Sequence, residues 1–433
     1  MPFFRTIKTL HLTPTLCCLI TSLSTLKTDI RTSPTLSMGP TINTFDAAIH
    51  PIVSGASVPN IKKGHTSDES RFCDLECRIC NLDSLDPTAV KNKIVVCENM
   101  FNTDNALLSG ASGVVINGNF GYEDLAFNWP LPTTYLSSKN GQKVLKYLNS
   151  TKTPTASILK SIALVDKEAP TVASFSARGP NRITLDVLKP DITAPGVDIL
   201  AAWSLGTTVT GQEGDKRVVP YNFVSGTSMA CPHATGAAAY VKSLHPDWSP
   251  AAIKSALMTT ATPMSPKKNT DAEFAYGSGQ INPLKAAHPG LVYDAGESDF
   301  VSFLCGQGYN ATHLKMVTGD NSACSGANNK TVWDLNYPSF ALSAPQSGSL
   351  VRTFHRTVTN VGATKCTYQA KVVAPTGLVV KVYPSSLAFR TVGEKLSFVV
   401  TVTATIGSKA LSGSLVWSDG VHDVTSPIIA FLY

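Results

Sequence analysis

The sequence predicts an α/β protein of several domains that ends in a β-sandwich. Short apolar strands alternate with helical segments over residues 93–160, and residues 228–261 carry two helices in succession. After residue 334 the pattern changes to short period-two strands separated by turns. The chain of 433 residues is 43% hydrophobic and 15% charged, so it can bury a large core and does not have the composition of a disordered chain.

The first predicted boundary lies near residue 39. Residues 1–38 are rich in Thr, Ser and Leu without a clean hydrophobic period, and we assign them no fold. Residues 39–160 are then predicted to form a small α/β domain. Within it, residues 93–97 and 113–116 are expected to be buried strands, and residues 141–148 carry helical spacing with one apolar face.

Residues 161–333 carry the strongest helix signals. Ser249 and Pro250 stand before the helical stretch 251–261 in the order that favours an N-cap followed by the first helical position. Residues 228–244 form another predicted helix, which a His-Pro pair ends.

Residues 334–433 are predicted to be a β-sandwich that folds as a unit. Period-two runs of β-branched or aromatic residues occupy residues 353–359, 378–382, 396–402 and 414–417, with Gly, Pro and Ser turns between them. Several short strands at this spacing are typical of a sandwich of about 100 residues.

Charge and hydropathy exclude two classes of partner. The net charge is +6, but no run of Lys and Arg concentrates it, so no nucleic-acid partner is expected. No stretch reaches the about 18 apolar residues of a membrane span. Residues 10–26 come nearest, but Ser, Thr and Pro interrupt them, and no clear signal-peptide cleavage site follows. Three glycosylation sequons, usable only in a secreted protein, lie at Asn149, Asn310 and Asn329.

Residues 226–233, Gly-Thr-Ser-Met-Ala-Cys-Pro-His, precede a helix rich in Gly and Ala. A serine hydroxyl is a poor nucleophile until a base takes its proton and donors stabilise the oxyanion. The start of a helix offers unpaired backbone N–H groups and a favourable dipole, and Gly226 would allow a tight turn and close approach of a substrate. Ser228 is therefore a candidate nucleophile, and the alternative is a serine that only caps the helix.

This motif and three further segments resemble the subtilisin-like serine proteases, or subtilases, and in particular their plant branch of the cucumisin type. The further segments are residues 170–180, 189–196 and 248–261, and the resemblance extends from about residue 39 to the C-terminus. It implies a serine endopeptidase that hydrolyses protein or peptide substrates through an acyl-enzyme at Ser228, without a cofactor or metal, in a secreted protein.

The resemblance also assigns the domains. Residues 39–160 correspond to an inserted protease-associated α/β domain, residues 161–333 to the C-terminal part of a subtilisin-like α/β catalytic domain, and residues 334–433 to a fibronectin type III-like sandwich. In relatives, the protease-associated domain contributes to substrate access or self-association. A homodimer through residues 39–160 is therefore an expectation.

The subtilase triad also needs an Asp and a His that precede the Ser, and an Asn in the oxyanion hole. The family motifs that carry these three residues are absent from this sequence. His233 follows Ser228 by five residues, which rotates its side chain by about 140° around a helix, away from the hydroxyl. We therefore expect no hydrolysis of peptides by this chain alone. The small-residue face of the helix that carries Ser228 is expected to be exposed. We interpret the absence of the motifs as the result of a truncated gene model. Cys231 is expected to be a buried thiol. The competing function is a catalytically inactive binding or interaction module.

Four cysteines gather between residues 73 and 97, and the spacing of Cys77 and Cys80 would also suit a zinc site. The resemblance instead implies a disulfide, and we favour it over a metal because it agrees with secretion. The disulfides expected on this basis are Cys80–Cys97 and, as a second pair, Cys305–Cys324.

Overall fold

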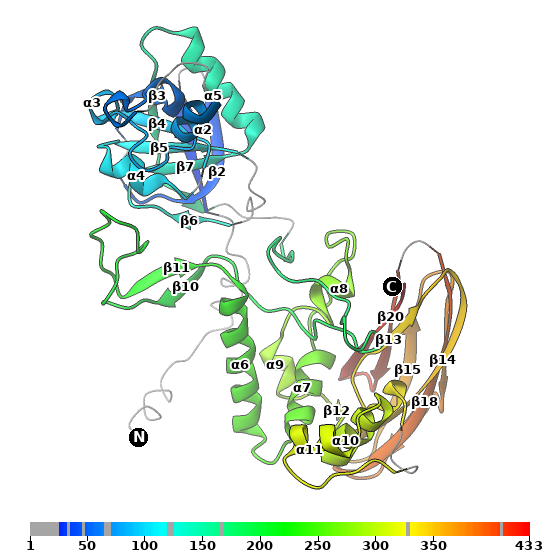
Figure 1. Cartoon of the computed structure of the whole chain (residues 1–433). Helices are drawn as coiled ribbons and strands as arrows, with labels where there is room; N and C mark the ends of the chain where they lie inside the picture. The colour runs from blue at the N-terminus through cyan, green and yellow to red at the C-terminus, as the bar shows by residue number, and fades with distance from the viewer. Residues whose placement is uncertain are drawn as a thin grey trace. The chain divides into compact units, whose positions relative to one another are not determined.

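The computed structural model describes residues 26–32, 35–45, 48–64, 71–99, 101–118, 125–163, 169–325, 330–407 and 410–433. The chain forms two compact units (Figure 1). The first joins the chain up to Phe175 with Pro195–Met229, and the second joins Ser176–Ala194 with Ala230–Tyr433.

The first unit is built on one mixed sheet. Its strand order is β6-β2-β1-β8-β3-β4-β5-β7, and β9 pairs with β1. Strands β3, β4, β5 and β7 are parallel, and both faces of β4 and β5 are buried, as apolar runs without alternation predict. The strands are β1 (Leu26–Thr32), β2 (Thr35–Ile42), β3 (His50–Ser54), β4 (Ile94–Cys97), β5 (Gly113–Asn117), β6 (Phe127–Asn128), β7 (Thr133–Leu136), β8 (Thr155–Ile158) and β9 (Ile162–Ala163).

Short helices connect the strands of this sheet, and α5 is the longest of them. Val144 of α5 is buried, and Leu145 and Leu148 pack beside it against one face of the sheet, which is the apolar face that the spacing predicted. The helices are α2 (Arg71–Arg78), α3 (Pro87–Val90), α4 (Thr103–Leu108) and α5 (Ser138–Ser150), with short 3-10 turns at η2 (Gly55–Ser57) and η3 (Ile61–Lys63).

The predicted boundaries of the small domain differ from the structure at both ends. Strand β1 and the first half of β2 lie within residues 1–38, to which we assigned no fold. They enter the sheet by backbone pairing with β8 and with each other, which requires no apolar periodicity. At the other end, β9 extends the sheet to Ala163.

The same unit contains a hairpin from the predicted catalytic part. Strands β10 (Ile199–Ala202) and β11 (Tyr221–Val224) form a separate two-stranded antiparallel sheet. The hairpin belongs to the compact unit of the small domain. The sequence pattern contained no signal for this grouping, because it depends on contacts between distant segments.

The second unit contains most of α6 and further helices that pack through small side chains. Ala237 and Val241 of α6 lie against Ala252 and Ala256 of α7 in one buried cluster. The predicted cap of α7 is present, since Ala252 N donates to Ser249 Oγ at 3.0 Å. The helices are α6 (Thr227–Leu244), α7 (Pro250–Thr259), α8 (Glu273–Tyr276), α9 (Pro283–Ala286), α10 (Glu297–Gly306) and α11 (Ala311–Thr318), with a 3-10 turn η4 (Val332–Asp334).

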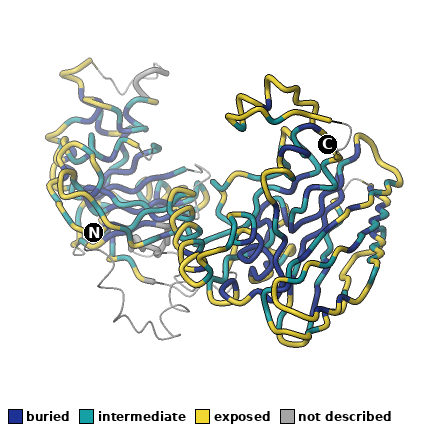
Figure 2. The backbone as a smooth tube through the Cα atoms, turned by 90° about the horizontal axis from the view of Figure 1, so that it is seen from below, coloured by how far each residue is buried: buried dark blue, intermediate teal, exposed yellow. Residues whose placement is uncertain are grey.

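The C-terminal part is the predicted β-sandwich. Its two sheets have the orders β12-β14-β18-β16 and β13-β20-β19-β15-β17. Buried residues, dark blue in Figure 2, follow the strands of the sandwich, and exposed residues follow its edges and loops. The strands are β12 (Leu291–Val292), β13 (Phe340–Ala344), β14 (Gly348–Asn360), β15 (Cys366–Val373), β16 (Leu378–Tyr383), β17 (Ser386–Phe389), β18 (Lys395–Ile406), β19 (Leu411–Ser418) and β20 (Asp423–Leu432).

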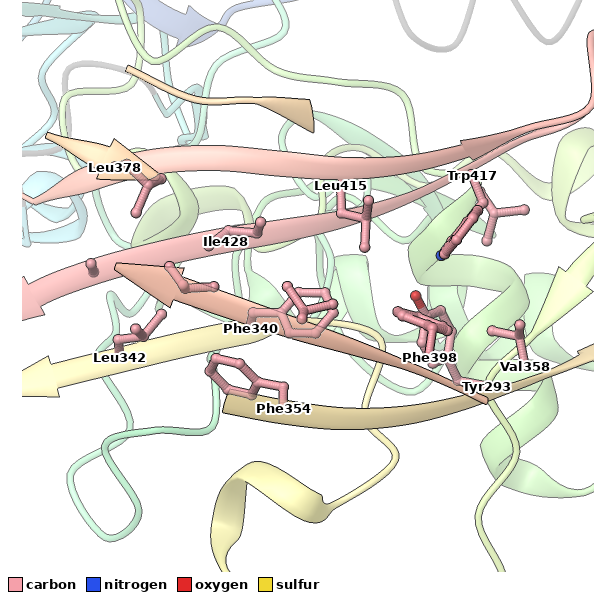
Figure 3. Packing of buried hydrophobic residues seen from close by; sticks show 14 of the residues in the cluster. Tyr293, Phe340, Leu342, Phe354, Val358, Leu378, Phe398, Leu415, Trp417 and Ile428 are labelled. Carbon is pink, nitrogen blue, oxygen red and sulfur yellow. The ribbon is translucent and has the colours of Figure 1, made fainter. Parts of the chain in front are cut away.

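The sandwich core includes residues that precede the predicted boundary at residue 334. Strand β12 pairs with β14, and Tyr293 is 1% exposed within the core (Figure 3). Its ring meets Phe398 edge-on with centroids 6.3 Å apart, and its hydroxyl lies 3.0 Å from Ser426 Oγ. The sandwich therefore starts structurally near Leu291.

Candidate active site

Ser228 is the second residue of α6, and its side chain is exposed. Strand β11 ends at Val224, and two residues connect it to the helix. A Cβ on Gly226 would lie 3.7 Å from Ser228 N, an ordinary contact. The backbone at Gly226 thus has no steric need for glycine in this structure, in contrast to the tight turn that we expected. The position still leaves the approach to Ser228 open.

The segment in front of Ser228 is hydrogen-bonded to residues 196–198 of the same unit, which precede β10. Asp198 N donates to Ser225 Oγ at 2.8 Å, and Ser225 Oγ donates to Asp198 Oδ1 at 3.2 Å. Gly226 N donates to Gly196 O at 2.8 Å. Asp198 is buried and engaged in these hydrogen bonds.

Across the described part of the chain, no hydrogen bond involves the Ser228 hydroxyl. His245, at the far end of α6, is engaged elsewhere: its Nε2 lies 2.7 Å from Ala287 O, and its ring stacks on Trp248. Two Asp–His pairs occur in the sandwich unit, Asp334–His355 at 2.8 Å and Asp419–His422 at 3.0 Å, and neither was expected from the sequence. The first pair joins η4 to β14, and the second lies within the turn between β19 and β20.

One face of α6 is exposed. Gly236 and Ala239 are exposed, and a Cβ on Gly236 would have no neighbour within 4 Å in the described structure. Cys231 lies on this side and is also exposed, so the prediction of a buried thiol is wrong. Its burial would require atoms packed over this face, and the described residues place none there.

The cysteines near the small sheet form a disulfide. Cys80 and Cys97 are bonded, as are Cys305 and Cys324, which are the pairs that the resemblance implied. The Cys80 thiolate is therefore not available as a zinc ligand. The described residues contain no group of three or more His, Cys, Asp or Glu side chains that could hold a metal ion.

Two of the three sequons can be located. Asn149 is exposed in the last turn of α5, which extends beyond the helical stretch 141–148 expected from the sequence. Asn310 is exposed and caps α11, with its Oδ1 accepting from His313 N at 3.0 Å. Asn329 lies outside the described residues.

A cavity of about 360 Å³ in the second unit was not expected from the sequence. Tyr337, which lines it, accepts from Lys189 Nζ at 2.9 Å, and Lys189 Nζ also donates to Asp191 at 2.7 Å. Burial of the Tyr337 hydroxyl raises its pKa most, and the neighbouring Asp191 carboxylate raises this pKa further. The cavity is lined by Ser249, Pro250, Ala251, Lys254, Tyr293, Ala295, Gly296, Glu297, Phe300, Leu335, Asn336, Tyr337 and Pro338.

An exposed serine at the start of a slim Gly/Ala helix, together with an α/β unit and a C-terminal sandwich, defines the class of the chain. Residues 74–279 match the subtilase family, and residues 334–430 match the fibronectin type-III domain. The chain therefore contains a segment, residues 74–279, that matches the subtilase family, followed by a fibronectin type-III domain.

Its relatives are plant enzymes by name. The chain is 44% identical over 403 residues to "Subtilisin-like protease SBT4.4" of Arabidopsis thaliana, which covers 91% of this chain and 53% of that protein. It is 46% identical over 358 residues to "Subtilisin-like protease SBT4.9" of the same plant, with 81% and 49% covered. The chain spans about half the length of the curated relatives it matches.

Among solved structures, the chain is similar to the psychrophilic subtilisin-like protease Apa1 from an Antarctic Pseudoalteromonas. The identity is 15%, with 62% of this chain and 50% of that chain covered. The TM-score of 0.21 is too low for a comparison of details. Among the described helices, none is both long and apolar enough to cross a membrane.

Proposed function

We propose that Ser228 is the nucleophile of a serine endopeptidase and that this chain supplies it without the rest of the triad. Support comes from one observation: the exposed hydroxyl lies at the N-terminus of α6, inside the segment that matches the subtilase family. A nucleophile at this place meets the unpaired N–H groups of the first helical turn.

In the proposed reaction, Ser228 Oγ attacks the carbonyl carbon of a peptide bond while its proton passes to a base. Backbone N–H groups at the start of α6 stabilise the oxyanion of the tetrahedral intermediate. Collapse of the intermediate releases the amine, which takes the proton back, and leaves an acyl-enzyme that water hydrolyses. The base, its orienting carboxylate and the oxyanion Asn come from family motifs that this sequence lacks. Losing the base alone forfeits most of a roughly 10⁶-fold acceleration in related enzymes.

A fluorophosphonate probe tests this assignment, because it labels only activated serines. The 433-residue chain should be labelled no more than its Ser228→Ala variant. When the part of SBT4.4 that this chain does not cover is fused ahead of it, labelling should appear, and it should disappear again in the Ser228→Ala fusion. Labelling of the unfused chain that Ser228→Ala abolishes would mean that another residue supplies the base. A correctly folded fusion without labelling would contradict the nucleophile role.

The proposed substrates are proteins or peptides, and the proposed site of action is outside the cell. The exposed sequons at Asn149 and Asn310 support the second point, since glycans are added to such sites on secreted chains. The last part of the proposal is that the chain forms a homodimer through the small domain. Sedimentation equilibrium of the purified chain should show a dimer, and a monomer at all concentrations would remove this part.

The second candidate function is an inactive binding module. One observation favours it: no side chain in the described residues hydrogen-bonds to the Ser228 hydroxyl. The fusion experiment separates the two candidates, because a module whose Ser228 has no catalytic role gains no labelling when the remaining residues are supplied.

A further inference from the structure

The hairpin in front of Ser228 lacks support from a larger sheet. Strands β10 and β11 pair only with each other in the described structure, over four residue pairs from Ile199–Val224 to Ala202–Tyr221. Leu200 and Tyr221 are each 62% exposed. An isolated two-stranded hairpin is marginally stable in water. Its conformation, and that of the segment which follows β11, therefore depends on contacts with the small domain.

Asn128 of the small domain makes the most direct of these contacts. Its Nδ2 donates to Asn222 Oδ1 at 2.8 Å and to Phe223 O at 3.0 Å, both on β11. Asn222 is buried, and its own Nδ2 donates to Val209 O at 2.9 Å. A single amide thus engages a side chain and a backbone carbonyl of the strand that ends four residues before Ser228.

The loop of the hairpin is attached to the same domain at a second place. Asp215 is buried, and its carboxylate accepts hydrogen bonds from Arg217 Nε at 2.9 Å and Thr210 Oγ1 at 2.8 Å. These bonds connect two parts of the loop to each other. The Arg217 guanidinium then donates to Trp129 O, and it lies 5.1 Å from the centroid of the Phe45 ring.

A third contact joins Thr103 and the loop. Thr103 Oγ1, fully buried, lies 3.2 Å from Gln212 Oε1. The three contacts come from three different segments of the small domain: strand β6 with the residue after it, the residues after β2, and the start of α4. Together they fix the position of the hairpin along its length.

We propose that Asn128 is a positioning residue for Ser228. By holding Asn222 and Phe223, it sets where β11 ends and where the Ser225–Gly226 connection enters α6. The small domain then has a role in the geometry of the nucleophile, in addition to any role in substrate access. The catalytic meaning of this inference rests on the function proposed for Ser228, but the positioning itself does not.

Hydrogen exchange of the 433-residue chain tests the positioning without any activity. In Asn128→Ala, peptide amides across Tyr221–Met229 should exchange about tenfold faster, because two hydrogen bonds worth about 1.4 kcal/mol in net terms are lost. Strands β4 and β5 should keep their protection. Asn140→Ala is the matched control: Asn140 is in the same domain, and its Oδ1 accepts only from Lys143 Nζ in the described structure. Unchanged exchange over Tyr221–Met229 in Asn128→Ala would overturn the proposal.

A second variant covers the case in which Asn128→Ala unfolds the small domain. Asn128→Asp keeps the shape of the side chain and removes the donor, so it should raise exchange over Tyr221–Met229 while β4 and β5 stay protected. Loss of protection in all these strands alike would mean that Asn128 acts on the stability of the small domain and not on Ser228.

The fusion used above gives the catalytic readout. Asn128→Ala should lower the limiting rate of fluorophosphonate labelling about tenfold and leave the half-saturating probe concentration unchanged, whereas Asn140→Ala should change neither. Equal limiting rates in Asn128→Ala and the unmodified fusion would refute a positioning role. If the unmodified fusion is not labelled at all, the proposed function fails, and the exchange data alone decide the inference.

Discussion

Tyr293 lies ahead of the predicted sandwich yet fills its core, which makes a quantitative test possible. The side chain is 1% exposed, and its hydroxyl lies 3.0 Å from Ser426 Oγ, which is fully buried. Burial raises the pKa of Tyr293 to about 12, so the hydroxyl is protonated at neutral pH. Tyr293→Ala removes a large ring from a packed core and should cost about 4 kcal/mol of unfolding free energy.

Tyr293→Phe isolates the hydrogen bond. It keeps the ring against Phe398 but leaves the Ser426 hydroxyl without this partner, and it should cost about 1.5 kcal/mol. Removing both partners in Tyr293→Phe/Ser426→Ala should cost less than the sum of the two single variants, because neither group is then left buried and unpaired.

Urea unfolding followed by hydrogen exchange in β18 and β20 measures these differences in the sandwich alone. The midpoint should shift to lower urea in the order Tyr293→Phe and then Tyr293→Ala. A Tyr293→Ala chain whose sandwich unfolds at the same urea concentration as the unmodified chain would refute the assignment of Tyr293 to this core. Strictly additive costs in the double variant would refute the hydrogen bond as the source of the smaller effect.

Three further changes have defined outcomes. Glu273 is buried with one carboxylate oxygen bonded to Ser412 and the other unpaired, and burial raises its pKa. The protonated Glu273 side chain therefore contributes stability below pH 4.5, and this contribution is lost as the pH rises through the raised pKa. Glu273→Gln should be more stable than the unmodified chain at pH 7 but not at pH 4. Equal thermal midpoints of the two chains at pH 7 would contradict this. Loss of the disulfide in Cys97→Ser should cost about 3 kcal/mol for a loop of this length, and an unchanged urea midpoint would show that the unfolded chain gains no freedom. When the chain is secreted from plant cells, peptide mapping should find glycans on Asn149 and Asn310; two unmodified asparagines would count against secretion.

Local sequence signals were sufficient to predict the helices and strands whose formation depends on residues close to them in the chain. The cap at Ser249 and the helix that starts beside Ser228 follow from residue types within one turn of each helix start. The strands around residues 353–359 and 396–402 were found because one face of each is buried and the other exposed. The disulfides came from the family resemblance and not from spacing, which left a zinc site open.

Long-range features could not be predicted in this way. Strand β20 contains Pro427, which usually argues against a strand interior. It is tolerated because pairing with β13 begins only at Ile428. The entry of Tyr293 into the sandwich and the attachment of β11 to Asn128 join segments 94 or more residues apart, so no local period records them. The exposure of Cys231 likewise depends on what covers α6, which its own sequence does not reveal.

The place of β20 in the sandwich has a consequence for variants that lack this strand. This last strand lies between β13 and β19, with Ile428, Ile429 and Ala430 fully buried. A stop codon that removes only residues 423–433 therefore takes out an inner strand and leaves β13 without its neighbour. Removal of β20 alone should therefore be as harmful to the sandwich as removal of a much longer segment, because an inner strand is lost in both cases.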